Sequence, residues 1–383
     1  MKICILYHSF FGETGGAGVT TYLRNLKRHL EARGHSVYII SARVKENEEK
    51  RFYYAPSISI WPLRAFTGHL TFLFSSFLKL IKVNRKERFD LIYTIGESGA
   101  FSPIIKRTLN KPIVHHLVVT WQTGLHNIEN KWDLKEYAWF IPLIPLDKLS
   151  ALNADKIITL CTFFKKEAIK YYNLNEERIV VIPNGVDIPE RREMTTNVRE
   201  KYGIHEKDIV FLFVGGTQKR KGINELIKAF NLANIPNKKL IIVGEITKDF
   251  QLSCKNKDFK GKVILAGRVS NEILKGIYSC SDIFVLPTKW EGQPIAVLEA
   301  MSYGLPIITT GKYGMVDQVD DGVTGFLLPS WNPKDIAAKM EKIVTMDYKK
   351  MGELSREKAE REFSWPSVAD RTIKVFEEVI GEK

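Results

Sequence analysis

Short apolar runs alternate with helical patterns along the chain. The run at 2–7 precedes apolar residues spaced as one helix face from Val19 to Leu30, and a second run follows at 37–40. Further runs with the length of strands lie at 91–93, 113–119, 156–159 and 179–182. Because parallel strands covered on both faces have this continuous apolar character, the pattern predicts a parallel α/β sheet.

A break at 183–187 and a polar segment at 189–207 separate this series from a second one. The strands expected in the second series lie at 209–214, 240–243, 263–265, 283–286 and 307–309. Since the alternation of strand and helix begins afresh after the break, the sequence predicts two α/β sheets with a cleft between them.

Composition and charge narrow the class of protein. The 383 residues are 44% hydrophobic and 26% charged, which is typical of a folded chain and excludes collagen-like and largely disordered proteins. The formal net charge is +13, and residues 1–187, with 26 basic and 17 acidic groups, hold +9 of it. Such an excess attracts phosphate, anionic lipid or nucleic acid without selecting among them.

The cysteines and the longest apolar stretch bear on where the protein works. The 4 cysteines include no Cys-x-x-Cys pair, so we expect neither a zinc site nor a disulfide framework, and we expect a reducing cytosol. The apolar stretch 70–83 is interrupted by Lys79 and Lys82. It is shorter than the ~20 apolar residues that cross a bilayer, so we expect a soluble or surface-bound protein.

Ligands bind open α/β sheets at the carboxyl ends of the strands, where two glycine-containing loops carry candidate chemistry. Gly15 and Gly16 precede the first helix, where backbone amides contact a phosphate or simply form a flexible turn. A later loop begins at Gly215 and holds three cations. These are Lys219, Arg220 and Lys221. They form either a seat for a diphosphate or a solvated basic turn.

A third loop carries acidic chemistry after the expected strand 283–286. Glu291 lies in this loop and Glu299 on the helix that begins near Pro294. Because carboxylates accept hydrogen bonds from sugar hydroxyls, the two glutamates are candidates for a sugar pocket. Taken alone, two glutamates eight residues apart are better explained as two ordinary surface residues.

Six motifs then follow one another in the order of a known family. They are Gly15-Gly16 before a helix ending at Arg33-Gly34, the segment 181–187, Lys221-Gly222, the segment 291–306, the segment 321–326, and Phe363-Ser364-Trp365. Together they resemble family 4 of the retaining glycosyltransferases, the glycosyl transferases group 1, which have the GT-B fold. The resemblance covers nearly the whole chain and implies two Rossmann-like domains with parallel sheets facing across a cleft. It also implies an acceptor-binding domain at 1–187, a nucleotide-sugar-binding domain at 188–365, and a helix at 366–383 that crosses back to the first domain.

The resemblance also implies roles for individual residues. Lys221 contacts the donor diphosphate and acts in catalysis with Glu291, which binds the hydroxyls of the transferred sugar. Residues expected beside that sugar are Gly292, Gln293 and Pro294. Residues expected at the diphosphate are Gly15, Gly16, Gly215, Lys219 and Arg220. Residues expected at the ribose or nucleobase are Glu299, Arg268, Val269, Val297 and Leu298.

Two departures from the family pattern affect these roles. The family has an arginine directly after the glycine at position 215, whereas this chain has Gly216, so phosphate binding falls on Lys221 with Lys219 and Arg220. The family also has a histidine in the loop after the run 113–119. Here His116 comes earlier and is a catalytic candidate, with a core or strand-edge histidine as the alternative.

The chemistry implied is front-face transfer from a UDP-, GDP- or other nucleotide sugar to a hydroxyl of a glycan, a lipid-linked or a small-molecule acceptor. A hexosyl- or N-acetylhexosaminyltransferase of cell-envelope glycan or polysaccharide biosynthesis is expected. The leaving diphosphate takes the acceptor's proton, and Lys221 stabilises the charge that develops. No Asp-x-Asp occurs in the sequence, so we expect no metal and no cofactor. The alternatives are a sugar-nucleotide epimerase or phosphorylase, or an inactive basic scaffold that binds membrane or nucleic acid. Since Lys221, Glu291 and Glu299 are intact, we expect an enzyme that does not bind nucleic acid.

Residues 57–88 suggest a membrane contact. The segment combines apolar residues from Ile58 to Ile81 with a series of basic side chains. These are Arg64, Lys79, Lys82, Arg85, Lys86 and Arg88. Apolar helices with basic flanks can lie in the headgroup region of an anionic surface, although a helix that is apolar all round is more often core. We therefore expect a cytoplasmic protein that binds the inner face of the cell membrane peripherally, and the sequence indicates no oligomeric state.

Overall fold

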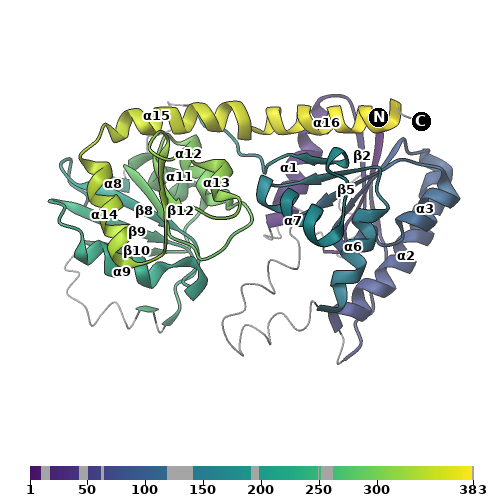
Figure 1. The fold of residues 1–383 in the computed structure, drawn as a ribbon, viewed down its shortest axis with the longest axis horizontal. Coiled ribbons are helices and arrows are strands. Elements are labelled where there is room, and N and C mark those ends of the chain that lie inside the picture. The colour runs from purple at the N-terminus through teal and green to yellow at the C-terminus, as the bar shows by residue number, and fades with distance from the viewer. Residues whose placement is uncertain are drawn as a thin grey trace. The chain divides into compact units, whose positions relative to one another are not determined.

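The computed structural model describes residues 1–9, 18–42, 51–61, 64–118, 141–190, 198–248, 250–251 and 262–381. The chain divides into two compact units, shown in Figure 1. Unit 1 comprises Met1–Asn184 and Trp365–Lys383, and unit 2 comprises Gly185–Ser364. The chain thus changes unit after Asn184 and after Ser364, where the sequence suggested boundaries at 187 and 365.

Unit 1 is built on a 7-stranded parallel sheet in the order β3-β2-β1-β4-β5-β6-β7. Its strands are β1 (Lys2–Leu6), β2 (Ser36–Ser41), β3 (Phe52–Tyr54), β4 (Leu91–Ile95), β5 (Ile113–Leu117), β6 (Lys156–Thr159) and β7 (Ile179–Val181). Its helices are α1 (Gly18–Ala32), α2 (Arg64–Glu87), α3 (Ser102–Leu109), α6 (Ile144–Leu152), α7 (Thr162–Tyr172) and α16 (Trp365–Gly381), and a 3-10 turn, η1 (Gly96–Gly99), follows β4.

Helices cover both faces of this sheet because alternate residues of a strand point to opposite sides. Ile3 and Ile5 of β1 join a core with α1 and α16, whereas Cys4 and Leu6 join a second core with α2, α3 and α7. The last helix, α16, packs against α1, as Figure 1 shows. The C-terminal helix is therefore part of unit 1.

Unit 2 is built on a 6-stranded parallel sheet in the order β10-β9-β8-β11-β12-β13. Its strands are β8 (Ile209–Val214), β9 (Lys238–Val243), β10 (Val263–Gly267), β11 (Ile283–Leu286), β12 (Ile307–Thr310) and β13 (Gly325–Leu328). Its α-helices are α8 (Val198–Lys201), α9 (Ile223–Leu232), α11 (Asn271–Cys280), α12 (Ile295–Ser302), α13 (Met315–Gln318), α14 (Pro333–Val344) and α15 (Tyr348–Lys358). A π-helix (Ala359–Phe363) leads from α15 toward α16.

Each sheet has one point at which the strand order reverses. In unit 1 the chain builds β1, β2 and β3 in one direction and then places β4 on the other side of β1. In unit 2 it builds β8, β9 and β10 and then places β11 on the other side of β8. The prediction of two Rossmann-like α/β sheets is confirmed. The edge strands β3 and β13 were not predicted.

Candidate active site

The reversal point of unit 2 brings together the loops that follow β8 and β11. The backbone amide of Lys289, after β11, donates a hydrogen bond of 2.7 Å to the carbonyl of Arg220, after β8. The hydroxyl of Thr288 donates to the same carbonyl over 3.0 Å. Two loops that are distant in sequence therefore lie together at the carboxyl edge of the sheet, where α/β folds bind ligands.

Gly222 allows the first of these loops to pass close beneath the second. Its φ is 71°, in the left-handed region that glycine adopts without steric cost. A Cβ at this position would lie 2.0 Å from the carbonyl oxygen of Pro287. Because residues 219–221 form a single 3-10 turn directly before Gly222, the three cations lie at the junction of the two loops.

Lys221 and Arg220 converge on one carboxylate. The Lys221 ammonium lies 2.5 Å from Oε1 of Glu291, and the Arg220 guanidinium forms an ion pair with the same oxygen. Arg220 also lies over the ring of Trp290, 5.3 Å from its centroid. The Lys221 and Glu291 side chains are each 17% exposed, so the cluster is partly buried but reaches solvent. Two cations thus contact one carboxylate among the described residues, with the exposed Lys219 in the same 3-10 turn, and this surplus of positive charge suits a diphosphate.

Glu299 lies on α12, the helix that follows Pro294. The hydroxyl of Tyr278 donates a hydrogen bond of 2.8 Å to Oε2 of Glu299. Burial raises the pKa of Glu299, and the hydrogen bond from Tyr278 partly opposes this rise. A carboxylate held in one orientation can accept hydrogen bonds from neighbouring hydroxyl groups, such as those of a ribose.

Other residues of the segment 291–299 serve packing. Val297 and Leu298 are fully buried in the core of unit 2, so their side chains pack there, and their expected place beside a ribose or nucleobase stays a prediction. They are apolar because they lie on the side of α12 that packs against the sheet. Gln293 is 5% exposed, and the backbone of Gly292 lies so close to the next loop that a Cβ on Gly314 would be 1.8 Å from its carbonyl oxygen.

The residues after β8, β9 and β10 are only partly brought together. A Cβ on Gly244, after β9, would lie 2.2 Å from the carbonyl oxygen of Gly215, so these two loops are in contact. Arg268, after the edge strand β10, is 76% exposed and pairs with Glu245 over 2.8 Å. Val269 packs against the core of unit 2. The structure thus places Gly215 beside the cation cluster and Arg268 at the edge of the sheet.

The candidates from the first half of the chain are placed differently. Gly15 and Gly16 lie outside the described residues. His116 lies on β5, is 1% exposed, and has its Nδ1 atom 2.6 Å from the hydroxyl oxygen of Tyr93. Burial lowers the pKa of His116 to about 3, so its ring is neutral. A side chain that is buried away from solvent does not contact an acceptor. We therefore assign His116 to the core, which was the alternative that the sequence left open.

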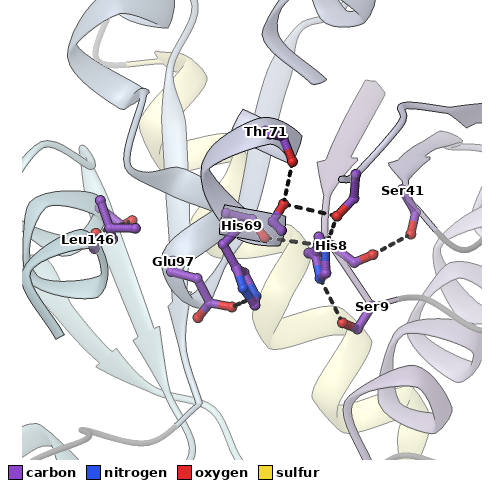
Figure 2. A network of polar contacts seen from close by, with 11 residues as sticks. His8, Ser9, Ser41, His69, Thr71, Glu97 and Leu146 are labelled. Carbon is purple, nitrogen blue, oxygen red and sulfur yellow. Dashed lines mark hydrogen bonds and ion pairs between the residues drawn. The ribbon is translucent and has the colours of Figure 1, made fainter. Parts of the chain in front are cut away.

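A polar cluster in unit 1 was missed by the sequence reasoning. Figure 2 shows His8, which follows β1, next to His69 on α2 and Glu97 in η1, which follows β4. The signal available in the sequence was that His8 and Glu97 each follow a strand, whereas His69 lies in an apolar helix. Among the described residues, no group of three or more His, Cys, Asp or Glu side chains is arranged to hold a metal ion.

Two family models match the chain. The model described as Glycosyltransferase Family 4 matches residues 16–190, and the model described as Glycosyl transferases group 1 matches residues 194–361. The two matches do not overlap, and together they span most of the sequence.

Similar proteins include UDP-Gal:alpha-D-GlcNAc-diphosphoundecaprenol alpha-1,3-galactosyltransferase from Escherichia coli, which is 29% identical over 66% of this chain and 66% of that protein. An uncharacterized glycosyltransferase from Methanocaldococcus jannaschii is 27% identical over 60% of this chain. The match spans 62% of that relative's length, so this chain covers less than two thirds of both proteins.

Solved structures resemble the whole chain. Sucrose-phosphate synthase from Thermosynechococcus elongatus has a TM-score of 0.79 and 19% identity, with 100% of both chains covered. HepE from Anabaena, solved in complex with UDP, has a TM-score of 0.76 and 16% identity over 99% of this chain and 100% of that chain. At these identities the likeness shows the GT-B fold alone.

Proposed function

We propose a sugar-transfer reaction for this chain, which belongs to the glycosyl transferases group 1. In this reaction a sugar moves from a nucleotide-diphosphate sugar, bound by unit 2, to a hydroxyl group of an acceptor, bound by unit 1. The observation that carries the proposal is the cluster of Lys221, Arg220 and Glu291 at the reversal point of the unit 2 sheet.

The cluster supports a donor with a diphosphate group. Lys221 and Arg220 supply positive charge at the carboxyl edge of the sheet, and Glu291 supplies acceptors for the hydroxyl groups of the transferred sugar. Glu299, held by Tyr278, is proposed to bind the ribose. The UDP complex of HepE and the UDP-Gal donor named for the Escherichia coli relative motivate a nucleotide sugar as the donor here.

We propose that transfer retains the anomeric configuration by front-face attack. The bond between the anomeric carbon and the diphosphate oxygen breaks, and the acceptor oxygen bonds to that carbon on the same face. The hydroxyl proton passes to the leaving diphosphate, whose charge Lys221 stabilises. Within the described part of the cluster, Glu291 is the single carboxylate and is engaged by two cations. This favours front-face attack over the two flanking carboxylates of a retaining glycosidase.

The test is donor turnover by paired variants. Lys221→Ala and Glu291→Ala should each lower the release of nucleotide diphosphate from a panel of UDP- and GDP-sugars by about 10²- to 10³-fold. The matched control is Lys228→Ala, at an exposed lysine on α9, the helix that follows the turn of Lys221, and it should turn over as the wild type does. Near-normal turnover of Lys221→Ala would show that the diphosphate binds elsewhere. An isomerised nucleotide sugar would instead identify an epimerase, and a requirement for inorganic phosphate would identify a phosphorylase.

We also propose that unit 1 meets an anionic membrane surface and that the acceptor is lipid-linked. On α2, Phe74 and Leu78 are 62% and 66% exposed, and the exposed Lys82 and Arg85 continue the same helix face. The diphosphoundecaprenol acceptor named for the Escherichia coli relative motivates a lipid-linked acceptor. No helix in the described part of the chain is long and apolar enough to span a bilayer.

A second apolar stretch lies beside this helix face. The hydroxyl oxygens of Thr71 and Thr67 accept hydrogen bonds of 2.8 Å from the amides of Ile58 and Ile60, so the segment before α2 runs along the helix. Ile58, Ile60 and Trp61 are 60%, 59% and 74% exposed. Other apolar residues of the segment 57–88 are core, among them Phe72, Leu73 and Leu80. Only part of that segment therefore supports the membrane proposal.

Co-sedimentation with vesicles tests this surface. The wild type should bind phosphatidylglycerol vesicles at low salt and dissociate as salt rises. Lys82→Glu/Arg85→Glu should weaken binding by about tenfold or more, since each basic residue contributes about 1 kcal/mol on an anionic surface. The charge-matched control is Arg28→Glu/Lys374→Glu. These residues lie on α1 and α16, which cover the opposite face of the sheet from α2, so the control should weaken vesicle binding much less. Equal effects of both variants, or no binding at low salt, would contradict the proposal.

A further inference from the structure

The cluster of His8, His69 and Glu97 occupies the reversal point of unit 1. His8 follows β1 and Glu97 follows β4, the two strands between which the strand order reverses. In unit 2 the equivalent positions, after β8 and β11, carry Lys221 and Glu291. Because open α/β sheets bind ligands at this point, the two clusters are topologically equivalent candidates for binding sites.

Hydrogen bonds and ring contacts hold the cluster in one arrangement, drawn in Figure 2. Nε2 of His69 lies 2.5 Å from Oε1 of Glu97, and the rings of His8 and His69 lie 4.2 Å apart between centroids. The two ring nitrogens of His8 lie 2.8 Å from the hydroxyl oxygen of Ser57 and 2.9 Å from that of Ser9. Both side chains of the ion pair remain partly accessible, at 13% for His69 and 14% for Glu97.

The carboxylate of this cluster faces histidines, which carry no permanent charge. Burial alone would raise the pKa of Glu97, but the hydrogen bond and charge of His69 and the charge of His8 lower it overall, so the carboxylate is ionised at neutral pH. Tyr7, next to Glu97, has its pKa raised to about 12, first by burial and then by the carboxylate charge, and remains a neutral hydroxyl. The three side chains that define this cluster, His8, His69 and Glu97, include no lysine or arginine, whereas the cluster of unit 2 is built on Lys221 and Arg220.

Packing alone does not account for an ion pair at this position. Phe72 and Leu80 of α2 are fully buried and already hold the helix against the sheet. A buried ion pair contributes little net stability compared with apolar residues of the same size, because both charges lose their hydration. Charged groups that are partly exposed at a ligand-binding edge are typical of functional sites.

We propose that Glu97 binds the sugar or polyol end of the acceptor, accepting hydrogen bonds from its hydroxyl groups, and that His69 is a positioning residue that holds the carboxylate. The inference rests on the proposed transfer function and adds the chemical class that unit 1 recognises. Histidine, serine and carboxylate side chains that hydrogen-bond one another suit a neutral polyhydroxyl ligand, whereas a phosphate would require permanent cations.

Histidine-ring NMR tests this with defined probes. Methyl α-D-glucopyranoside and its 2-acetamido analogue should shift the ring signals of His8 and His69 in the wild type, and inorganic phosphate should shift them less. Glu97→Gln should weaken glycoside binding by about tenfold or more, since a hydrogen bond to a charged group is lost. The matched control is Glu87→Gln, at the C-terminus of α2, where Glu87 accepts a hydrogen bond of 2.9 Å from Tyr38. It should bind the glycosides as the wild type does.

The outcomes separate this inference from the proposed function. A wild type that hydrolyses no nucleotide sugar would contradict the transfer function, whereas the glycoside shifts are measured without a donor. Absence of shifts at His8 and His69, a folded Glu97→Gln that binds as the wild type does, or a preference for phosphate would each overturn the inference. If Glu97→Gln does not fold, His69→Asn takes its place, and we expect it to weaken glycoside binding as read from the ring signals of His8; glycoside binding equal to that of the wild type would overturn the inference.

Discussion

Substituting Asp147 with Asn should change how the stability of unit 1 depends on pH. Asp147 lies in the first turn of α6, is 1% exposed, and accepts a hydrogen bond of 2.7 Å from the hydroxyl of Tyr172. Burial raises its pKa to about 8, with the charge of Glu97 adding to the rise and the Tyr172 hydrogen bond opposing it. His115 lies 4.0 Å away, but burial lowers its pKa to about 3, so both groups are neutral at neutral pH and form no ion pair.

The size of the effect follows from proton binding. An aspartate in the unfolded chain loses its proton near pH ~4, whereas Asp147 in the folded chain keeps its proton until about pH 8. Since the folded state binds one more proton across this window, the free energy of unfolding falls by about 1.4 kcal/mol for each unit of rising pH. The loss reaches about 4 kcal/mol near neutral pH. The asparagine of the Asp147→Asn variant would not titrate, yet its amide oxygen can still accept the hydrogen bond from Tyr172.

Hydrogen exchange of the amides in β4 and β5 measures the stability of unit 1 separately from unit 2. The quantity to compare is the difference between the wild type and Asp147→Asn at each pH, because the intrinsic pH dependence of exchange cancels in that difference. We expect the free energy of unfolding of the variant to rise steadily relative to that of the wild type from pH ~5 to ~8. Above the pKa of Asp147 in the folded state, this difference should stop growing. A difference that is constant across this range would show that Asp147 does not carry a proton in the folded state.

Three other predictions concern unit 2 and catalysis. Gly222→Ala should destabilise unit 2 by at least about 2 kcal/mol, because the alanine would adopt a positive φ and its Cβ would clash with Pro287. The control is Gly203→Ala, where φ is 60° but no neighbouring atom lies within 4 Å of the added Cβ, so only the cost of the positive φ is expected. Equal losses of stability for the two variants in urea denaturation would contradict this. Tyr278→Phe should raise the pKa of Glu299 further, because the hydrogen bond that lowers this pKa is removed. NMR titration of the Glu299 carboxyl group measures this, and a pKa that falls or does not change in the variant would contradict the prediction. Turnover should persist in EDTA, and activity that EDTA abolishes and manganese restores would refute metal independence.

Much of the fold could be predicted because a buried parallel strand needs apolar residues on both sides. The central strands of both sheets lie on the apolar runs. The two missed strands lie at sheet edges and are short: β3 covers Phe52–Tyr54, and β13 covers Gly325–Leu328. Neither forms a long apolar run: β3 has one buried residue of three, and β13 has three apolar residues after Gly325.

The sequence could predict which loops form the candidate site. Lys221 and Glu291 both follow strands, and neighbouring parallel strands end at the same edge, so their proximity follows from topology. The sequence could not show that Arg220 shares the Glu291 oxygen and stacks on Trp290, because these contacts depend on side-chain conformation. His116 was ambiguous for a related reason, since a strand pattern does not show how completely a polar residue is sealed from solvent.

The two reversal points show how one topology can be adapted to two ligands. In both units a carboxylate follows one of the two strands at the reversal point, and a nitrogen-bearing side chain contacts it. In unit 2 the pair is Glu291 with Lys221, and in unit 1 it is Glu97 with His69. The backbone arrangement is shared, so selectivity must come from the side chains. Two permanent cations on one carboxylate leave a net positive charge, which a diphosphate neutralises. Histidines carry no permanent charge, so in unit 1 the carboxylate can still accept hydrogen bonds, and hydroxyl groups can supply them. Replacing His69 with lysine should therefore shift the probe preference of unit 1 from glycosides toward inorganic phosphate, and an unchanged preference in the histidine-ring NMR titration, read from His8, would show that charge balance does not set the ligand class.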